Sequence, residues 1–249
     1  MERRKDKEDT YVRLNRFLAM CGFGSRRKVE EIIRDGRVSV DGSQVDVPSL
    51  MVSKKNLVCV DGERALPLKK VYLVMNKPEG VVCAVSDKYY RTVLDLLPVS
   101  MKDMGIFPVG RLDRMSSGLL IMTNDGELAQ QVSHPSNNVS KSYEVLLNRA
   151  ITGRDISKWK TGLSIEGKKL VPLSVEIIPR EPSGRWIHIT LREGIKREIR
   201  IMAQDLGYAV KMLTRKRIGK MELIFIPPGK YLSLGREELM DMIRNGGSL

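Results

Sequence analysis

One carboxylate in the sequence stands out as a candidate for chemistry. The segment 107–113 reads F-P-V-G-R-L-D, and its last residue, Asp113, lies between Arg111 and Arg114 just before the apolar segment 118–123. A neighbouring cation favours the ionised form of a carboxylate, and an ionised Asp can act as a nucleophile. An Asp in a turn before a strand is more often a capping or turn residue. The local pattern alone leaves both interpretations open.

The chain lacks the sequence signatures of cofactor chemistry. It contains no G-x-x-x-x-G-K-[ST] phosphate loop, no G-x-G-x-x-G and no H-E-x-x-H. Its three cysteines, Cys21, Cys59 and Cys83, are odd in number and far apart, and the only histidines are His134 and His188. These observations argue against a disulfide framework and a zinc site. We therefore expect chemistry without a cofactor or metal, in a reducing compartment such as the cytoplasm.

The charge of the chain indicates its type of partner. It has 43 Lys and Arg against 30 Asp and Glu, a net charge of +13. Such a surplus favours a polyanion, most simply nucleic acid, although basic surfaces are also common for other reasons. No apolar run approaches the roughly 18 to 20 residues of a membrane span, so we expect no membrane partner. We expect the protein to be a monomer.

The N-terminal part of the sequence predicts a small basic module. Residues 1–10 are charged and almost free of apolar side chains, and we expect a disordered tail there. Apolar residues at helical spacing predict a helix from Leu14 to Cys21, and Ser25 is placed to cap a second helix that Gly36 ends. Two short hairpins with Asp-Gly turns should follow. We place the module at 11–62 and a linker at 63–70.

The remainder, 71–249, predicts an α+β domain. Apolar or alternating segments indicate strands at 71–75, 81–85, 118–123, 143–147, 173–178 and 186–191. A short helix is expected at 127–132. A second helix is expected from Ile195 onward, with an apolar stripe that ends at Gly207 and with Lys196, Arg197 and Arg200 off that stripe.

The segment 13–42 resembles the small RNA-binding module that is named after a ribosomal protein of the small subunit. It reads R-L-N-R-F-L-A-M-C-G-F-G-S-R-R-K-V-E-E-I-I-R-D-G-R-V-S-V-D-G. The helix capped by Ser25 presents its N-terminal dipole to a phosphate. We expect RNA contacts from the cations of this helix and its exit, namely Arg26, Arg27, Lys28 and Arg37. An ordinary solvated basic face is the alternative.

Motifs in the larger domain resemble those of pseudouridine synthases of the RsuA/RluB branch, which modify ribosomal RNA. They are L-V-M-N-K-P-E-G (73–80), V-G-R-L-D (109–113), S-S-G-L-L-I-M-T-N-D-G-E-L (116–128), H-P-S (134–136), K-S-Y (141–143), E-G-I-K-R-E-I-R-I-M (193–202) and L-T-R-K-R-I-G (213–219). The resemblance follows the chain in order over nearly its whole length. It implies an α+β domain around a mixed, largely antiparallel sheet with a cleft across its middle.

The resemblance also assigns roles to individual residues. Asp113 corresponds to the nucleophile, which attacks the target uridine while the uracil is detached, turned and rejoined through carbon. Tyr143 corresponds to a tyrosine that stacks on the base and assists proton loss, although a strand tyrosine is commonly just packing. Arg200 corresponds to the cation that pairs with the aspartate and keeps it ionised and oriented. Arg111 corresponds to an arginine that fills the space of the flipped uridine.

Further RNA contacts are expected from basic residues near the cleft, namely Lys196, Arg197, Arg215 and Arg217. Isomerisation conserves all atoms, so no cofactor is implied. The motif spellings favour large-subunit over small-subunit RNA, either naked or in an assembling ribosomal subunit. A non-catalytic ribosome-assembly factor that keeps the fold and a synthase acting on transfer RNA are the alternatives.

The chain departs from the family pattern at three positions. Met115 stands where relatives usually have an acidic or amide residue, which affects loop hydrogen bonding rather than the nucleophile. Glu198 stands at a usual Gln, and Ile201 at a usual basic position. These two changes put RNA affinity or target choice in question.

Overall fold

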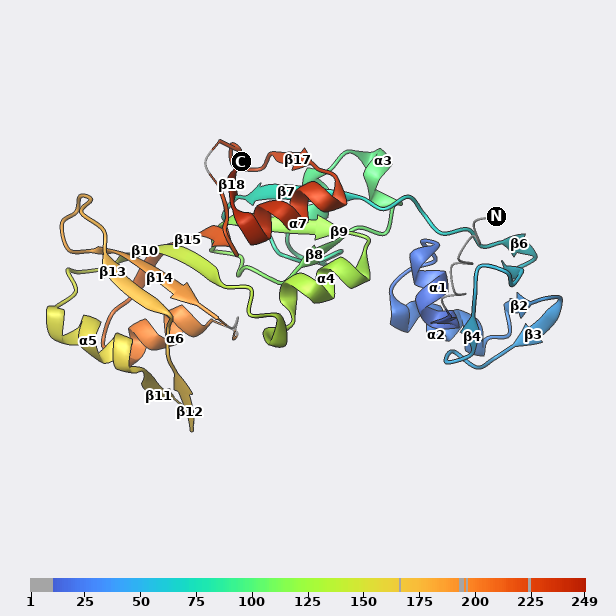
Figure 1. Cartoon of the computed structure of the whole chain (residues 1–249), viewed down its shortest axis with the longest axis horizontal. Helices are drawn as coiled ribbons and strands as arrows, with labels where there is room; N and C mark the ends of the chain where they lie inside the picture. The colour runs from blue at the N-terminus through green and yellow to red at the C-terminus, as the bar shows by residue number, and fades with distance from the viewer. Residues whose placement is uncertain (1–10, 166, 193–194, 196, 224) are drawn as a thin grey trace, which may run out of the picture. The chain divides into compact units, whose positions relative to one another are not determined.

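The computed structural model of the protein describes residues 11–165, 167–192, 195, 197–223 and 225–249. The chain divides into two compact units (Figure 1). One unit contains the residues up to Lys70 together with Val99–Gly105, and the other contains Val71–Pro98 and Ile106–Leu249. The predicted tail at 1–10 and Lys196 lie outside the described residues. In the part of the chain that is described, no helix is long and apolar enough to cross a membrane.

The first unit contains the two predicted helices, α1 (Leu14–Met20) and α2 (Arg26–Arg34). The Ser25 hydroxyl accepts a hydrogen bond from the Lys28 N–H at 3.3 Å, which confirms the predicted cap of α2. The apolar faces of both helices pack into one core, whose fully buried helical members are Leu14, Leu18, Val29 and Ile33.

Short strands complete this unit. A four-stranded antiparallel sheet has the order β3 (Ser43–Val45), β2 (Val38–Val40), β5 (Val58–Val60) and β6 (Glu63–Arg64), and β1 (Val12–Arg13) pairs with β4 (Met51–Val52). Strand β6 lies within the segment 63–70 that we expected to be a linker. The turn at Asp61 and Gly62, both at positive φ, returns the chain directly along β5. Ala65 then packs in the core.

The second unit is built on one mixed sheet. Its main path runs β13 (Ser174–Ile177), β14 (Trp186–Leu191), β10 (Lys141–Leu147), β15 (Val210–Ile218), β9 (Ser117–Thr123), β7 (Tyr72–Lys77) and β17 (Tyr231–Ser233). Along this path only the pairing of β15 with β9 is parallel. The predicted α+β fold with a largely antiparallel sheet is therefore confirmed.

Smaller elements surround this sheet. Strand β8 (Phe107–Val109) pairs with β9, β16 (Met221–Glu222) pairs with β15 and β18 (Gly247–Ser248), and β11 (Leu163–Ile165) pairs with β12 (Lys168–Leu170). The helices are α4 (Gly126–Ser133), α5 (Gly153–Thr161), α6 (Glu198–Asp205) and α7 (Arg236–Asn245), with short 3-10 turns at Val93–Leu96 and Pro135–Asn137. Helix α3 (Val99–Lys102) belongs to the first unit.

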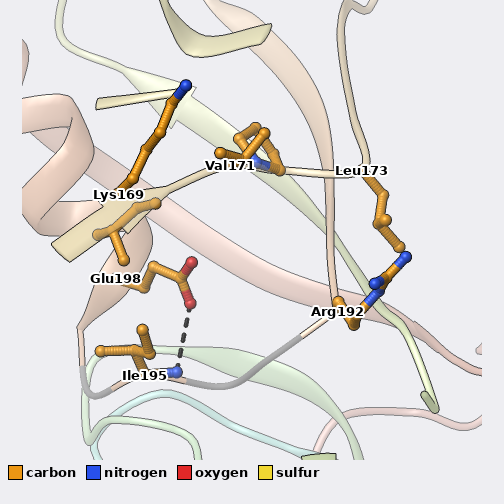
Figure 2. Close-up of a pocket in the computed structure, with 8 residues that line it drawn as sticks. Lys169, Val171, Leu173, Arg192, Ile195 and Glu198 are labelled. Atoms are coloured by element: carbon orange, nitrogen blue, oxygen red, sulfur yellow. Dashed lines mark hydrogen bonds between the residues drawn. The ribbon is translucent and has the colours of Figure 1, made fainter. Parts of the chain in front are cut away.

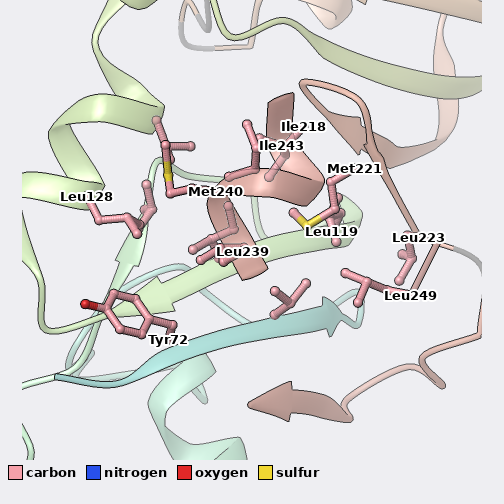
Figure 3. Packing of buried hydrophobic residues seen from close by; sticks show 14 of the residues in the cluster. Tyr72, Leu119, Leu128, Ile218, Met221, Leu223, Leu239, Met240, Ile243 and Leu249 are labelled. Atoms are coloured by element: carbon pink, nitrogen blue, oxygen red, sulfur yellow. The ribbon is translucent and has the colours of Figure 1, made fainter. Parts of the chain in front are cut away.

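Two helices cover one face of strands β7 and β9. Leu119 and Ile121 alternate along β9 and belong to one buried cluster with Leu128 of α4 and Leu239 of α7. Figure 3 shows the packing of this cluster. Alternate residues of a strand lie on one face. This core fixes β9, and with it the loop before β9 that carries Asp113.

Two predicted elements differ from the structure. The segment 81–85 is a loop rather than a strand, because only Val82 forms a bridge, to Thr92, and the Ala84 N–H turns back to the Val82 carbonyl at 3.0 Å. Helix α6 begins at Glu198 rather than near Ile195. Arg197 precedes it in the left-handed conformation at φ 58°, which a continuous helix does not allow.

Candidate active site

Asp113 lies in the loop between β8 and β9, next to a cation from another part of the chain. The Ser116 N–H donates to the Asp113 main-chain carbonyl at 3.0 Å, so the residue does form a turn. Its carboxylate is directed elsewhere: the Asp113 Oδ2 atom is 3.7 Å from the Arg200 Nε atom, with 31% of the Asp113 side chain exposed. The turn therefore presents the carboxylate both to Arg200 and to solvent. The structure thus brings Asp113 and Arg200 together, as the resemblance implied.

Arg200 holds the loop as well as the carboxylate. Its Nη2 atom donates to the Met115 carbonyl at 2.9 Å and to the Ser116 hydroxyl at 3.4 Å, and its Nη1 atom donates to the Val210 carbonyl at 3.2 Å. Burial lowers the pKa of the Arg200 guanidinium, and the Asp113 charge opposes this change. Met115 contributes through its main chain, while its side chain is exposed. The departure at position 115 therefore leaves this contact intact.

Lys77, to which the sequence analysis gave no role, supports the same loop from strand β7. This lysine is fully buried, and its Nζ atom donates to the carbonyls of Pro78 at 2.9 Å, Arg114 at 3.3 Å and Ser116 at 2.6 Å. Burial lowers the pKa of Lys77, and nearby acidic groups that include Asp113 oppose the change. The sequence offered one indication of this role, a Lys at the end of an apolar strand within the N-K-P-E-G segment.

The register of the sheet places Tyr143 two strands away from β9. Tyr143 lies opposite Arg215 of β15, and Arg215 lies opposite Gly118 of β9, five residues after Asp113. Opposite residues on neighbouring strands share a face of the sheet. Tyr143 of β10 and Arg215 of β15 thus lie on one face of the sheet. Strand β15 is adjacent to β9, and β10 is the next strand beyond β15. Tyr143 is 8% exposed, so most of its ring is packed.

Arg215 is buried rather than presented on the surface. It is 4% exposed, its Nε atom donates to the Leu119 carbonyl at 2.7 Å, and its Nη2 atom has no hydrogen-bond partner. The buried Cys83 thiol lies nearby and accepts from the Leu112 N–H at 3.3 Å. Burial raises the pKa of Cys83, while Lys77 and Arg215 act to lower it. Arg215 is therefore an interior residue and not an exposed cation.

Glu198, the second departure, closes one side of a separate pocket (Figure 2). Its Oε2 atom accepts from the Ile195 N–H at 3.2 Å, and Glu198 is 6% exposed. The pocket has a volume of about 330 Å³ and is lined by Lys169, Leu170, Val171, Pro172, Leu173, Arg192, Ile195 and Glu198. Asp113 is not among these residues. Glu198 thus accepts a hydrogen bond from the segment just before α6 and lines this pocket.

Comparison with known proteins places this arrangement in a family. The family model described as RNA pseudouridylate synthase matches residues 71–205, and the model of the S4 domain matches residues 12–58. The chain belongs to the RNA pseudouridylate synthase family. The resemblance to the synthases and to the RNA-binding module is therefore confirmed.

Several RNA pseudouridine synthases are similar to the chain over most of its length. The uncharacterized RNA pseudouridine synthase YtzG of Bacillus subtilis (strain 168) is 38% identical, over 92% of this chain and 97% of its own. The dual-specificity RNA pseudouridine synthase RluF of Escherichia coli (strain K12) is 31% identical, over 95% of this chain and 80% of its own. A crystal structure of a pseudouridylate synthase, 24% identical, shares the fold with a TM-score of 0.65 over 92% of this chain and 98% of that chain.

The basic residues expected to contact RNA occupy different settings in this pseudouridine synthase. Arg26, Arg27 and Lys28 are exposed in the first turn of α2. Arg111 and Arg197 are exposed beside the site. Two others are already paired, Arg37 with Asp61 at 3.0 Å and Arg217 with Glu222 at 2.6 Å. RNA contact by each residue stays a prediction.

The described residues offer no obvious metal centre in this pseudouridine synthase. Among them, no group of three His, Cys, Asp or Glu side chains could hold a metal ion.

Proposed function

We propose that this pseudouridine synthase isomerises a specific uridine in ribosomal RNA with Asp113 as the nucleophile. The observation that carries the proposal is the approach of the Arg200 Nε atom to the Asp113 Oδ2 atom at 3.7 Å. A reacting carboxylate needs a fixed direction and partial access to substrate. Arg200 fixes the direction of the Asp113 carboxylate, and the 31% exposure of the Asp113 side chain gives the substrate access to it.

The other site residues complete the proposed reaction. Asp113 attacks the sugar carbon that carries the base, and the bond from this carbon to the uracil nitrogen breaks. The detached uracil turns, and one of its ring carbons bonds to the same sugar carbon and displaces the Asp113 carboxylate. The proton lost from that ring carbon is balanced by a proton gained at the freed ring nitrogen. Tyr143 stacks on the loose base and assists removal of the ring proton at the carbon that forms the new bond. The uridine must leave the RNA stack to reach Asp113, which costs a few kcal/mol. Arg111 fills the space that the flipped uridine leaves. Other exposed cations such as Arg197 offset part of that cost through phosphate contacts.

We further propose large-subunit RNA as the preferred substrate. The spellings V-G-R-L-D, T-N-D-G-E-L-A and H-P-S support this choice. A chloroplast relative of Arabidopsis thaliana, provisionally named ribosomal large subunit pseudouridine synthase SVR1, is 34% identical over 91% of this chain and 59% of its own. Its name agrees with the choice, and the net charge of +13 suits a folded RNA target.

The test is to incubate the purified protein with unmodified ribosomal RNA of both subunits and to map pseudouridine by carbodiimide-dependent primer-extension stops. The matched control is Asp113→Asn, which keeps the size of the side chain and removes the nucleophile. We expect one new stop in large-subunit RNA that the control lacks.

The other results each have a defined meaning. A stop that persists with Asp113→Asn would overturn the role of Asp113, and a stop in small-subunit RNA would overturn the proposed preference. If naked RNA gives no stop, the same assay on ribosomal precursor particles follows. Binding to both substrates without any stop would refute the proposed reaction.

A further inference from the structure

Two adjacent tyrosines are exposed on the loop between β7 and the 3-10 turn Val93–Leu96. Tyr89 is 80% exposed and Tyr90 is 50% exposed. Single exposed apolar residues are normal on a protein surface. Two neighbouring rings, each with a cation above it, form a more specific arrangement.

The loop holds these rings in a defined place. The Asp87 Oδ1 atom accepts hydrogen bonds from the Tyr89 and Tyr90 N–H groups, both at 2.9 Å. At the base of the loop, the Val82 N–H donates to the Arg91 carbonyl at 2.9 Å, and the bridge between Val82 and Thr92 closes it. A preorganised surface loses little conformational entropy when a ligand binds.

A cation accompanies each ring, and the cation over Tyr90 belongs to the loop that carries Asp113. The Arg114 guanidinium lies 4.6 Å from the centre of the Tyr90 ring, and the Lys88 Nζ atom lies 5.6 Å from the centre of the Tyr89 ring. Arg114 directly follows Asp113, and its carbonyl accepts from the Gly80 N–H at 2.8 Å. The tyrosines therefore border the loop that carries the proposed nucleophile.

We propose that Tyr89 and Tyr90 form a stacking platform for unpaired nucleotides next to the target uridine, an inference that rests on the proposed function. Aromatic rings stack on any nucleobase, and adjacent cations attract the phosphates between bases. Extruding one uridine leaves neighbouring bases without a stacking partner. A platform beside Asp113 replaces that lost stacking. A ribosomal protein is a less suitable occupant, because the net charge of +13 and the cations over both rings suit a polyanion.

The test measures the affinity of the full chain for a fluorescein-labelled decauridylate and for the same strand paired with decaadenylate, by fluorescence anisotropy. The variants are Tyr89→Ala and Tyr90→Ala, with Tyr89→Phe and Tyr90→Phe to keep the rings. Phe225→Ala is a matched control, because Phe225 is a 77% exposed ring elsewhere in the same unit.

We expect each Ala variant to bind the single strand at least about 5-fold more weakly, as the loss of one stacked base requires. The Phe variants and Phe225→Ala should bind like the wild type, and affinity for the duplex should not change. Wild-type affinity of both Ala variants for the single strand, or no binding of the single strand by the wild type, would overturn the platform. A surface for a protein partner would give the first of these results.

This measurement is independent of turnover. A loss of single-strand affinity in the Ala variants would support the platform even if the primer-extension test refuted the role of Asp113. Unchanged affinity would refute the platform even if pseudouridine formed as proposed. The two failures are therefore distinguishable.

Discussion

The buried ammonium group of Lys77 donates a 2.6 Å hydrogen bond to the main-chain carbonyl of Ser116. Ser116 is three residues after Asp113, and the Met115 carbonyl between them accepts from Arg200 at 2.9 Å. The loop of the candidate nucleophile is thus held from strand β7 by one cation and from helix α6 by another. Neither contact uses the carboxylate itself, so the loop has a defined shape that does not depend on it.

Replacing Lys77 by Met should destabilise the protein and slow the reaction. The variant keeps the side-chain bulk but leaves the Ser116 carbonyl without the buried donor that binds it at 2.6 Å, whereas the Arg114 carbonyl keeps its bond from the Gly80 N–H. Each buried acceptor that loses its partner costs about 1 to 3 kcal/mol. We expect the free energy of unfolding in urea to fall by about that amount. The single-turnover rate should fall while RNA affinity stays near wild type, and a variant with wild-type stability and rate would contradict this role.

Replacing Arg200 by Lys should reduce the rate far more than it reduces RNA affinity. Lysine retains the charge but cannot contact Asp113, Met115 and Val210 together in the way the guanidinium does. Misplacing a catalytic group by about 1 Å can cost about 100-fold in rate. We expect a single-turnover rate reduced by that order on saturating RNA. Arg154→Lys, an exposed substitution on α5, is the control, and equal rates for the two variants would exclude a positioning role for Arg200.

Local sequence patterns predicted most helices and strands, but not the loop at 81–85 or the left-handed residue that precedes α6. The cap of Ser25 and the strands around 118–123 follow from residue type and spacing, and both are present. The segment 81–85 is a continuous apolar run of the kind that strands often have, but it forms a loop in which only Val82 makes a bridge, to Thr92. The delayed start of α6 depends on the positive φ of Arg197, which its residue type does not indicate.

The site was predictable only where a motif supplied it. The pairing of Asp113 with Arg200 joins residues far apart in the chain, and the resemblance alone brought them together. Lys77 was missed because lysines are rarely fully buried. Its partners are main-chain carbonyls, which no side-chain pattern reveals.

Gly118→Ala should strongly destabilise the larger unit, whereas Gly126→Ala should not. Gly118 has a φ of +104°, and an added Cβ atom would lie 2.7 Å from the Arg215 main-chain nitrogen, at the parallel pairing of β9 with β15. Positive φ costs a residue with a Cβ atom about 1 to 3 kcal/mol, and an overpacked contact adds about 1 to 3 kcal/mol. Gly126 begins α4 with open space around it. Similar unfolding midpoints in urea for the two variants would contradict the expected clash.

The basic turn of α2 should contribute to the salt dependence of RNA binding. Arg26, Arg27 and Lys28 are exposed around the cap made by Ser25. If all three contact phosphates, replacing them by Gln should reduce the slope of log affinity against log salt by roughly 2 to 3, since each contact contributes about 0.7 to 0.9. Filter binding to ribosomal RNA at several salt concentrations measures the slope. An unchanged slope in a folded variant would show that this turn does not hold phosphates.

Tyr72→Phe should change how stability depends on alkaline pH. The Tyr72 hydroxyl donates to the Asp125 Oδ2 atom at 3.0 Å, and burial, with this bond, raises the pKa of Tyr72 from 10.0 to about 12. Below pH 10, the variant should be less stable by about 1 kcal/mol, because one hydrogen bond is lost.

The difference between Tyr72→Phe and the wild type should shrink as the pH rises above 10. The unfolded wild-type chain then releases a proton that the folded chain retains, so wild-type stability falls by at most about 1.4 kcal/mol per pH unit from this group. Phenylalanine has no proton to release, and all other titrating groups are common to both proteins. Urea unfolding of both proteins between pH 8 and pH 11 measures the difference. A constant difference across this range would show that the hydroxyl of Tyr72 is not held protonated by its burial and by Asp125.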